Sequence, residues 1–221
     1  MRKVLVTGGA RGIGKAIVEK FKSEDYEVFA PTREELNLMD MESIKIFVDK
    51  YKDIYFDVII NNAGCNEINK IEDITDEELK SMMFVNLIAP IKLLGGLVPQ
   101  MKKNNYGKII NIASIWAVVS KPGRCVYSAT KNGVHGVTNT LALELAPFNI
   151  LVNTVCPGFT LTELTKKNNS QEEIEKISAD IPLKRMAEPQ EIADVVFFLG
   201  NEKNTYLTGQ KIIVDGGFSS K

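Results

Sequence analysis

The sequence predicts an α/β protein built on one doubly wound parallel sheet with helices on both faces. Short apolar, β-branched runs alternate with amphipathic segments along the whole 221-residue chain. Strands that are apolar throughout are typical of parallel sheets covered on both faces. The composition is 44% hydrophobic and no long linker or repeat interrupts it. We therefore expect residues 1–221 to form a single domain with one large core.

The alternation places each element in turn. Strands are expected at residues 3–7, 26–30, 57–60, 108–112, 149–155 and 211–214. Helices are expected at residues 12–23, 40–51, 75–103, 124–145 and 189–199, because apolar residues recur there at intervals of three and four. The third helix is expected to bend near Pro90. Ligands of such sheets bind at the carboxyl ends of the strands, so the segments that follow the strands are the candidate site.

A glycine-rich segment, TGGARGIG at residues 7–14, joins the first strand to the first helix. Glycine lets the backbone turn tightly and approach a ligand closely. The free N–H groups at a helix start, together with the helix dipole, favour a pyrophosphate. A glycine cluster in this position predicts dinucleotide binding more strongly than a simple turn.

A tyrosine and a lysine, Tyr127 and Lys131, are four residues apart on the expected helix 124–145 and so project from one face. A lysine cation near a phenol favours the phenolate and lowers its pKa from about 10. The tyrosine can then serve as a proton donor and acceptor. Ser114 follows another expected strand and can bind the oxygen that gains or loses the proton. On spacing alone, an ordinary surface pair is the alternative.

Composition excludes several classes of function. The net charge of −1 lacks the basic excess of a nucleic-acid binder. No uninterrupted apolar run reaches the 18 or so residues of a membrane span, and the N-terminus leaves no room for a signal peptide. The three cysteines are scattered and fit neither a disulfide framework nor a zinc site. We therefore expect a cytoplasmic protein without a bound metal.

Several motifs occur in the order of one known family. They are TGxxxGxG at residues 7–14, NNAG at 61–64, Asn86, Ser114, YSATK at 127–131 and PG at 157–158. Over nearly its whole length the chain resembles the classical branch of the short-chain dehydrogenase/reductase family, whose fold is of the Rossmann type. The segments LALELAP at 141–147 and IPLKR at 181–185 are most similar to the 3-oxoacyl-carrier-protein reductases.

This resemblance implies hydride transfer between a nicotinamide and a carbonyl or secondary-alcohol substrate. Tyr127 would exchange the proton, Ser114 would donate a hydrogen bond to the reacting oxygen, and Lys131 would lower the tyrosine pKa and hold the nicotinamide ribose. Asn86 would hold a water that links Lys131 to solvent; the alternative is a polar residue that caps or bends its helix. The remaining residues implied to bind the cofactor are Gly8, Arg11, Gly12, Ile13, Gly14, Thr32, Arg33, Asn37, Leu38, Asn62, Ala63, Gly64, Pro157, Gly158, Thr160 and Thr162.

The end of the second strand favours NADP(H) over NAD(H). An NAD enzyme usually has an acidic residue there, whereas this chain has Pro31 and Thr32 followed by Arg33. An arginine suits a 2′-phosphate, and Arg11 is a second candidate. Arg33 could instead pair with Glu34 or Glu35. Residues 33–37 also connect directly where most relatives have a full helix, and Asn37 replaces the usual adenine-binding aspartate.

Other functions remain open at this stage. Nucleotide-sugar epimerases and dehydratases usually carry TGxxGxxG and a longer C-terminal domain. Enoyl reductases usually space the tyrosine and lysine more widely. Cofactor-sensing proteins without catalytic activity tend to lose either the tyrosine or the lysine. Asn105 and Phe148 replace basic residues that dock acyl carrier proteins, so a sugar, another small ketone or an alcohol is also a candidate substrate. A polar loop at 160–181 is expected to cover the pocket.

We further expect a homo-oligomer, a dimer or tetramer. The resemblance implies that helices 75–103 and 124–145 pack against their copies. Their apolar residues could equally belong to the core; they include Leu93, Leu94, Leu97, Val134 and Val137.

Overall fold

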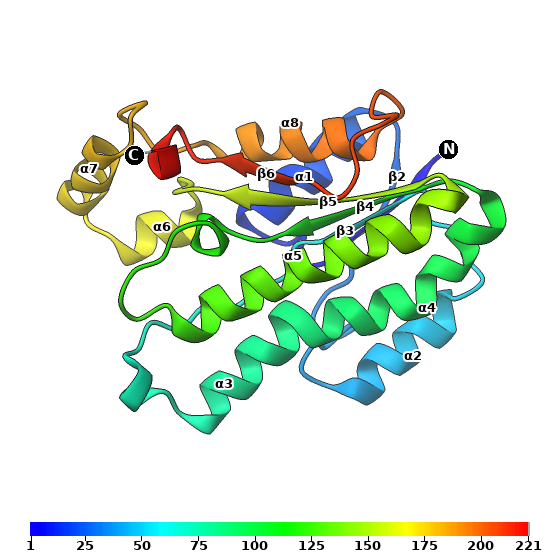
Figure 1. The fold of residues 1–221 in the computed structure, drawn as a ribbon, viewed down its shortest axis with the longest axis horizontal. Helices are drawn as coiled ribbons and strands as arrows, with labels where there is room; N and C mark the ends of the chain where they lie inside the picture. The colour runs from blue at the N-terminus through cyan, green and yellow to red at the C-terminus, as the bar shows by residue number, and fades with distance from the viewer. Residues whose placement is uncertain (221) are drawn as a thin grey trace.

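The computed structural model describes residues 1–220, except for the side chain of Asn168. Its centre is a six-stranded parallel sheet in the order β2-β1-β3-β4-β5-β6 (Figure 1). The strands are β1 (Lys3–Val6), β2 (Glu27–Phe29), β3 (Val58–Asn61), β4 (Gly107–Ile112), β5 (Ile150–Pro157) and β6 (Lys211–Val214). Each strand lies within three residues of its predicted position, and the predicted fold class is confirmed.

The central strands explain why the sequence shows continuous apolar runs. Every residue of β3, β4 and β5 is buried. The pairing of β4 with β5 runs from Gly107 opposite Ile150 to Ile112 opposite Val155. Side chains on both faces of these strands therefore pack against helices, and the two large apolar clusters of the core lie on opposite faces of the sheet.

Helices cover both faces (Figure 1). One layer holds α1 (Gly12–Ser23) and α8 (Pro189–Gly200); the other holds α2 (Met41–Tyr51), α4 (Ala89–Asn104) and α5 (Cys125–Leu145). The short elements are α3 (Asp76–Met83), η1 (Ile71–Asp73), η3 (Ile115–Ala117), η4 (Ala146–Phe148) and η5 (Phe218–Ser220). No helix lies between Phe29 and Met41, as the short connection predicted.

The predicted helix 75–103 is continuous but changes its winding. Between α3 and α4 it contains a π-helical segment, η2 (Phe84–Ile88), and Pro90 follows in the first turn of α4. A proline is tolerated at a helix start, so the local deviation falls just before it. The bend expected near Pro90 is thus the π-helical segment that carries Asn86.

The same stretch, Asp76–Asn104, is long and apolar enough to cross a membrane by length and composition alone, although charged residues interrupt its apolar runs. That is weak evidence for a span, because core helices pass the same test, and this one packs beside α2 and α5 in the helical layer. Only 39% of its most apolar window is buried, which leaves an apolar face uncovered.

The segment expected to be a polar loop is largely helical, so that expectation is wrong. It contains α6 (Glu163–Asn168) and α7 (Gln171–Asp180). Thr162 caps α6, and Ser170 with Glu173 forms a capping box at the start of α7. The Ser-x-x-Glu signature was readable in the sequence, but the polar composition of residues 165–170 obscured it.

Candidate active site

The glycine loop after β1 has a shape that side chains would fill. Gly8 and Gly12 have φ angles of +66° and +54°. A Cβ on Gly14 would lie 2.1 Å from the Gly8 carbonyl oxygen. These positions therefore require glycine, and the bare backbone at the start of α1 is a cradle that fits a dinucleotide pyrophosphate.

The NNAG segment braces this loop. The Asn62 side chain donates hydrogen bonds of 3.0 Å to the carbonyl oxygens of both Thr7 and Gly8. In return, the Thr7 hydroxyl accepts from the backbone N–H groups of Asn62 and Ala63, each at 3.1 Å. The Asn62 amide is thus engaged in holding the loop, and Ala63 and Gly64 continue along the edge of the site.

Ser114, Tyr127 and Lys131 converge beyond the ends of β4 and β5. The Lys131 Nζ lies 5.7 Å from the centre of the Tyr127 ring and donates a 2.9 Å hydrogen bond to the Ile112 carbonyl oxygen. Ser114 lies close enough to the Tyr127 side chain to oppose the rise of its pKa. The Ser114 Oγ also accepts a bond from the Trp116 N–H at 3.3 Å, which fixes the serine at the strand end.

The protonation of this group differs from the expectation that Lys131 lowers the tyrosine pKa. Burial raises the pKa of Tyr127 above its usual value, and the hydrogen bond to Ser114 and the charge of Arg124 oppose that shift. Burial likewise lowers the pKa of Lys131 to about 8. Desolvation disfavours the charged form of each side chain. The phenol is therefore protonated at neutral pH and is poised to donate a proton.

Asn86 lies beside this group. Its Oδ1 accepts a 2.9 Å bond from the Cys65 N–H, and its Nδ2 donates to the Cys65 carbonyl oxygen at 2.9 Å and to the Thr130 hydroxyl at 3.1 Å. A Cβ on Gly64 would lie 3.3 Å from both Asn86 Oδ1 and Lys131 Nζ. Asn86 thus ties η2 to the chain after β3 and to α5, with its amide next to the lysine.

The residues expected to bind the adenosine end lie at the surface after β1 and β2. Arg11 is exposed at the start of α1, next to the half-buried Ile13. Arg33 is exposed and forms no ion pair with Glu34 or Glu35 among residues 1–220, so that alternative pairing is not observed. The Thr32 N–H instead donates to the Glu35 carboxylate at 2.8 Å, which shapes the turn.

Asn37 and Leu38 follow this turn. The Asn37 Oδ1 already accepts a 3.1 Å bond from the Met39 N–H, and one lone pair of that oxygen remains for a further donor. Leu38 is half-buried against the core.

The end of β5 brings a third segment to the site. The Gly158 N–H donates to the Val214 carbonyl oxygen at 2.8 Å, directly after Pro157. The Thr160 hydroxyl donates to the Gly158 carbonyl oxygen at 3.1 Å. Thr162 lies over the glycine loop, since its Cγ2 would be 3.3 Å from a Cβ on Gly12. The residues expected at both ends of a cofactor therefore line one continuous edge of the sheet.

Sequence reasoning did not assign the residues next to Tyr127 on the substrate side. Arg124, one helical turn before Tyr127, is buried, and its guanidinium lies over the Trp116 ring with Cζ 5.5 Å from the ring centre. Trp116 in turn meets the ring of Phe159 at 6.0 Å between centres. The i, i+3 spacing of Arg124 and Tyr127 was the available signal.

Comparisons with known proteins agree with this geometry. The profile of a family described as enoyl-(acyl carrier protein) reductase matches residues 33–219. The 3-oxoacyl-[acyl-carrier-protein] reductase FabG of Thermotoga maritima is 36% identical over 236 residues, covering 96% of each chain. Among solved structures, "ElxO with NADP Bound" superposes with a TM-score of 0.93 at 28% identity, over 100% of this chain and 99% of that one. A 4-hydroxyisoleucine dehydrogenase complexed with NADH gives a TM-score of 0.92 at 26% identity, over 100% of both chains.

Proposed function

Because the chain belongs to the short-chain dehydrogenase/reductase family, we propose that it reduces a small carbonyl compound with NADP(H), with Tyr127 as the proton donor. The protein is an NAD(P)-dependent oxidoreductase. The observation that supports this role is the convergence of Tyr127 with Ser114 and Lys131 beyond the ends of β4 and β5, where the Lys131 Nζ lies 5.7 Å from the centre of the tyrosine ring.

Each residue of the group has a separate task in this proposal. The bound nicotinamide supplies or accepts the hydride. Tyr127 gives its proton to the carbonyl oxygen as negative charge develops there, and Ser114 donates a hydrogen bond to the same oxygen. Lys131 stabilises the phenolate that remains, and Asn86 holds the chain after β3 against the lysine.

Tyr127→Phe tests the mechanism because it keeps the ring and removes the acid. We expect kcat for an accepted ketone to fall at least about 100-fold, in the range that acid–base catalysis contributes. NADPH binding, followed by its fluorescence, should stay near the wild-type value. Turnover near wild type in the variant would contradict the role of Tyr127.

The preference for NADP(H) over NAD(H) rests on Arg33 and Arg11, which are both exposed, and on Pro31 and Thr32, which stand after β2 where an NAD enzyme usually has an acidic residue. We expect Arg33→Ala to raise the KM for NADPH about 10- to 100-fold, because charge-assisted bonds contribute about 1.5–3 kcal/mol. The KM for NADH should change little. A wild-type enzyme that prefers NADH would refute the preference.

Two substrate classes follow from the family. One is a 3-oxoacyl thioester, as the name of the Thermotoga maritima relative suggests. The other is a small ketone or sugar. Lys102 stacks on the Phe148 ring, with Nζ 5.0 Å from its centre, and lines a groove between helices rather than the entrance beside Tyr127. That arrangement favours a small free substrate over a carrier-bound one, and parallel assays with both would separate them.

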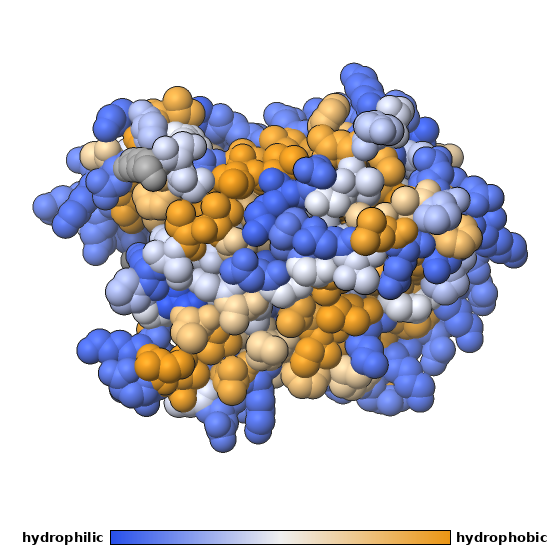
Figure 2. Space-filling model, viewed as in Figure 1, coloured by the Kyte–Doolittle hydropathy of each residue, from blue (hydrophilic) through white to orange (hydrophobic). Residues whose placement is uncertain are grey.

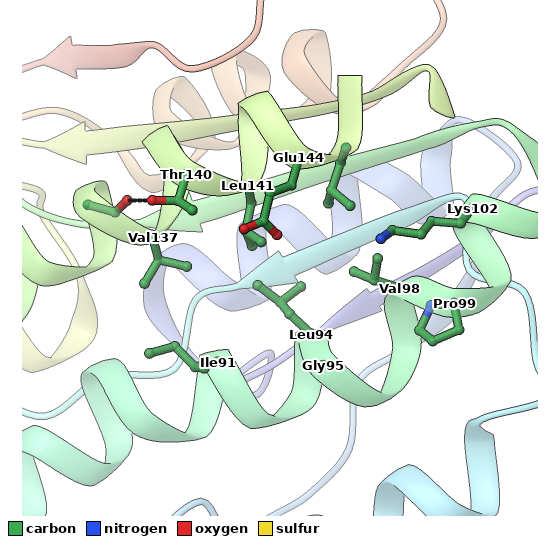
Figure 3. Close-up of a pocket in the computed structure, with 12 residues that line it drawn as sticks. Ile91, Leu94, Gly95, Val98, Pro99, Lys102, Val137, Thr140, Leu141 and Glu144 are labelled. Atoms are coloured by element: carbon green, nitrogen blue, oxygen red, sulfur yellow. Dashed lines mark hydrogen bonds between the residues drawn. The ribbon is translucent and has the colours of Figure 1, made fainter. Parts of the chain in front are cut away.

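We propose that residues 1–221 act as one domain in the cytoplasm and associate through α4 and α5. Strands from both ends of the chain share one sheet. Between the two helices lies an apolar groove of about 760 Å³, into which Leu94, Val137 and Leu141 point (Figure 3). Figure 2 shows apolar residues gathered over this face of the molecule. Leu93, Leu94, Leu97 and Val134 are all buried, and Val137 is half-buried.

A second copy of the chain would cover this groove. Light scattering should give a dimer or tetramer, and Val137→Glu, which places a charge in the groove, should shift the protein toward monomer. A monomeric wild type would refute the association.

A further inference from the structure

Two nitrogens of a buried cation beside Tyr127 lack a hydrogen-bond partner within residues 1–220. The side chain of Arg124 belongs to a residue that is only 8% exposed. Its Nε and one terminal nitrogen are fully buried and form no hydrogen bond. No acidic residue pairs with it among the ion pairs within residues 1–220. A buried guanidinium without a counter-charge is costly, so this arrangement points to a ligand that supplies one.

The surroundings of Arg124 add further positive potential. Lys121 also lies over Trp116, with its Nζ 5.3 Å from the ring centre, so two cations share one aromatic ring. Arg124 is the N-cap residue of the 21-residue helix α5, whose first turn contains no acidic residue and no capping side chain. Helix starts of this kind favour anions. The buried arginine, the second cation and the helix start therefore all favour negative charge at the same place.

The location of this charge ties it to the reacting centre. Arg124 and Tyr127 are one helical turn apart, and such residues have Cβ atoms about 5–6 Å apart. The charge of Arg124 is among the influences that lower the Tyr127 pKa against burial, which places the two groups within electrostatic reach. An anion bound by Arg124 would therefore lie only a few bonds from a carbonyl that Tyr127 protonates.

The aromatic ring beneath Arg124 belongs to an apolar cluster. The rings of Trp116, Phe159 and Phe218 meet edge to face, with centres 5.3–6.5 Å apart. Apolar side chains beside an ion pair lower the local dielectric and strengthen the pair. Such a cluster also suits a short hydrocarbon body and offers little to the several hydroxyls of a sugar.

We propose that Arg124 binds the carboxylate of the substrate, and that the substrates of this enzyme are short 2- or 3-oxo acids and the corresponding hydroxy acids. This inference rests on the proposed function and names its substrate class. In the reduction, the hydride forms a C–H bond at the oxo carbon while Tyr127 transfers its proton to the oxo oxygen. The carboxylate keeps its charge throughout and serves only to bind and orient the molecule. Because Arg124 is buried, it is not available to dock the surface of a carrier protein.

The first test compares an acid with its neutral ester in the wild-type enzyme with NADPH. Acetoacetate and methyl acetoacetate form one such pair, and 2-oxobutanoate with its methyl ester forms another. We expect kcat/KM to be at least about tenfold higher for an acid than for its ester, as a charge-assisted bond implies. Equal or better use of both esters would overturn the proposal, and this comparison needs no folded variant.

The second test uses Arg124→Gln and Arg124→Lys. Loss of the Arg124 charge acts on Tyr127 with either substrate, so the test is the difference between the two. Arg124→Gln should lower kcat/KM for the acid at least about tenfold more than for the ester, whereas Arg124→Lys should recover part of that difference. A matched control is Arg2→Gln, which removes an arginine at the opposite end of the sheet and should leave both substrates unchanged. Equal losses on acid and ester in Arg124→Gln would overturn the inference.

The proposed function and this inference can fail separately. If neutral ketones are reduced and depend on Tyr127, but acids are not preferred, only the carboxylate site is wrong. If Tyr127→Phe reduces ketones as fast as the wild type, the proposed mechanism itself fails.

Discussion

Replacing Asn86 by alanine should destabilise the whole protein and not only slow the reaction. Asn86 is 1% exposed in the π-helical segment between α3 and α4. Alanine removes both the amide oxygen and the amide nitrogen. The Cys65 N–H and C=O groups and the Thr130 hydroxyl then each lose a partner.

The expected magnitude follows from those three bonds. Each contributes about 1 kcal/mol net, and a backbone group left unpaired in a buried place costs about 1–3 kcal/mol. We therefore expect the free energy of unfolding to fall by about 3–5 kcal/mol. For a chain of this size, 1 kcal/mol lowers Tm by about 2–4 °C, so Tm should fall by roughly 6–20 °C.

Urea unfolding followed by circular dichroism measures the change. Asn104→Ala is the matched control, because that exposed amide makes a single 2.7 Å bond to the Gln100 carbonyl oxygen at the end of α4. Its cost should stay below about 1 kcal/mol. If Asn86→Ala unfolds within about 0.5 kcal/mol of the wild type, the bonds around Asn86 do not hold η2 to the chain after β3, and the reasoning is refuted.

Three further predictions concern the loop, the core and the groove. Gly14→Ala places a Cβ 2.1 Å from the Gly8 carbonyl oxygen and 2.5 Å from Asn62 Nδ2. The glycine loop must shift to relieve these contacts, so NADPH affinity should drop at least about tenfold. An unchanged Kd in a fluorescence titration would contradict this prediction. Burial lowers the pKa of Lys108 to about 8. Between pH 8 and 9.5 the unfolded chain therefore keeps a proton on Lys108 that the folded chain releases. The free energy of unfolding should rise with pH over this range. Lys108→Met should remove up to about 1.4 kcal/mol per pH unit of that slope, and an unaltered slope in urea titrations at several pH values would rule the assignment out. Gly136 lines the groove, and no atom of the same copy lies within 4 Å of the position that a Cβ would take there. The monomer should therefore accept Gly136→Ala, whereas a second copy packed closely against this glycine would meet the added methyl group, and self-association should weaken. Sedimentation that shows unchanged association would argue against close packing there.

Local sequence patterns predicted most of the fold. The β-branched runs gave all six strands because a buried parallel strand needs apolar residues on both faces. The 3.6-residue periodicity of apolar residues predicted the long helices, because each long helix buries one apolar face against the sheet. It was not applied to α6 and α7, which are short and largely polar, although Ile174 and Ile177 of α7 are three residues apart and Ser170 with Glu173 forms its capping box.

The candidate site was predictable as a set of residues but not as an electrostatic environment. The glycine loop, NNAG, Ser114, Tyr127, Lys131 and Gly158 all follow strands, and parallel strands end at one edge, so their convergence follows from chain order alone. Asn62 is different: its amide braces the carbonyls of Thr7 and Gly8, residues that are more than fifty positions away. No local sequence pattern predicts such a hydrogen bond.

The sequence by itself therefore determined the architecture and proposed the members of the candidate site, because periodicity and spacing act over a few residues at a time. Only the tertiary structure decided their exposure and the direction of their pKa shifts. Burial by segments distant in sequence raises the pKa of Tyr127 and lowers that of Lys131, the reverse of what their spacing suggested for the tyrosine. The same packing places Arg124 against Trp116 with no acidic partner among the described residues 1–220. Desolvation depends on every neighbour at once, and the neighbours are assembled only when the chain folds.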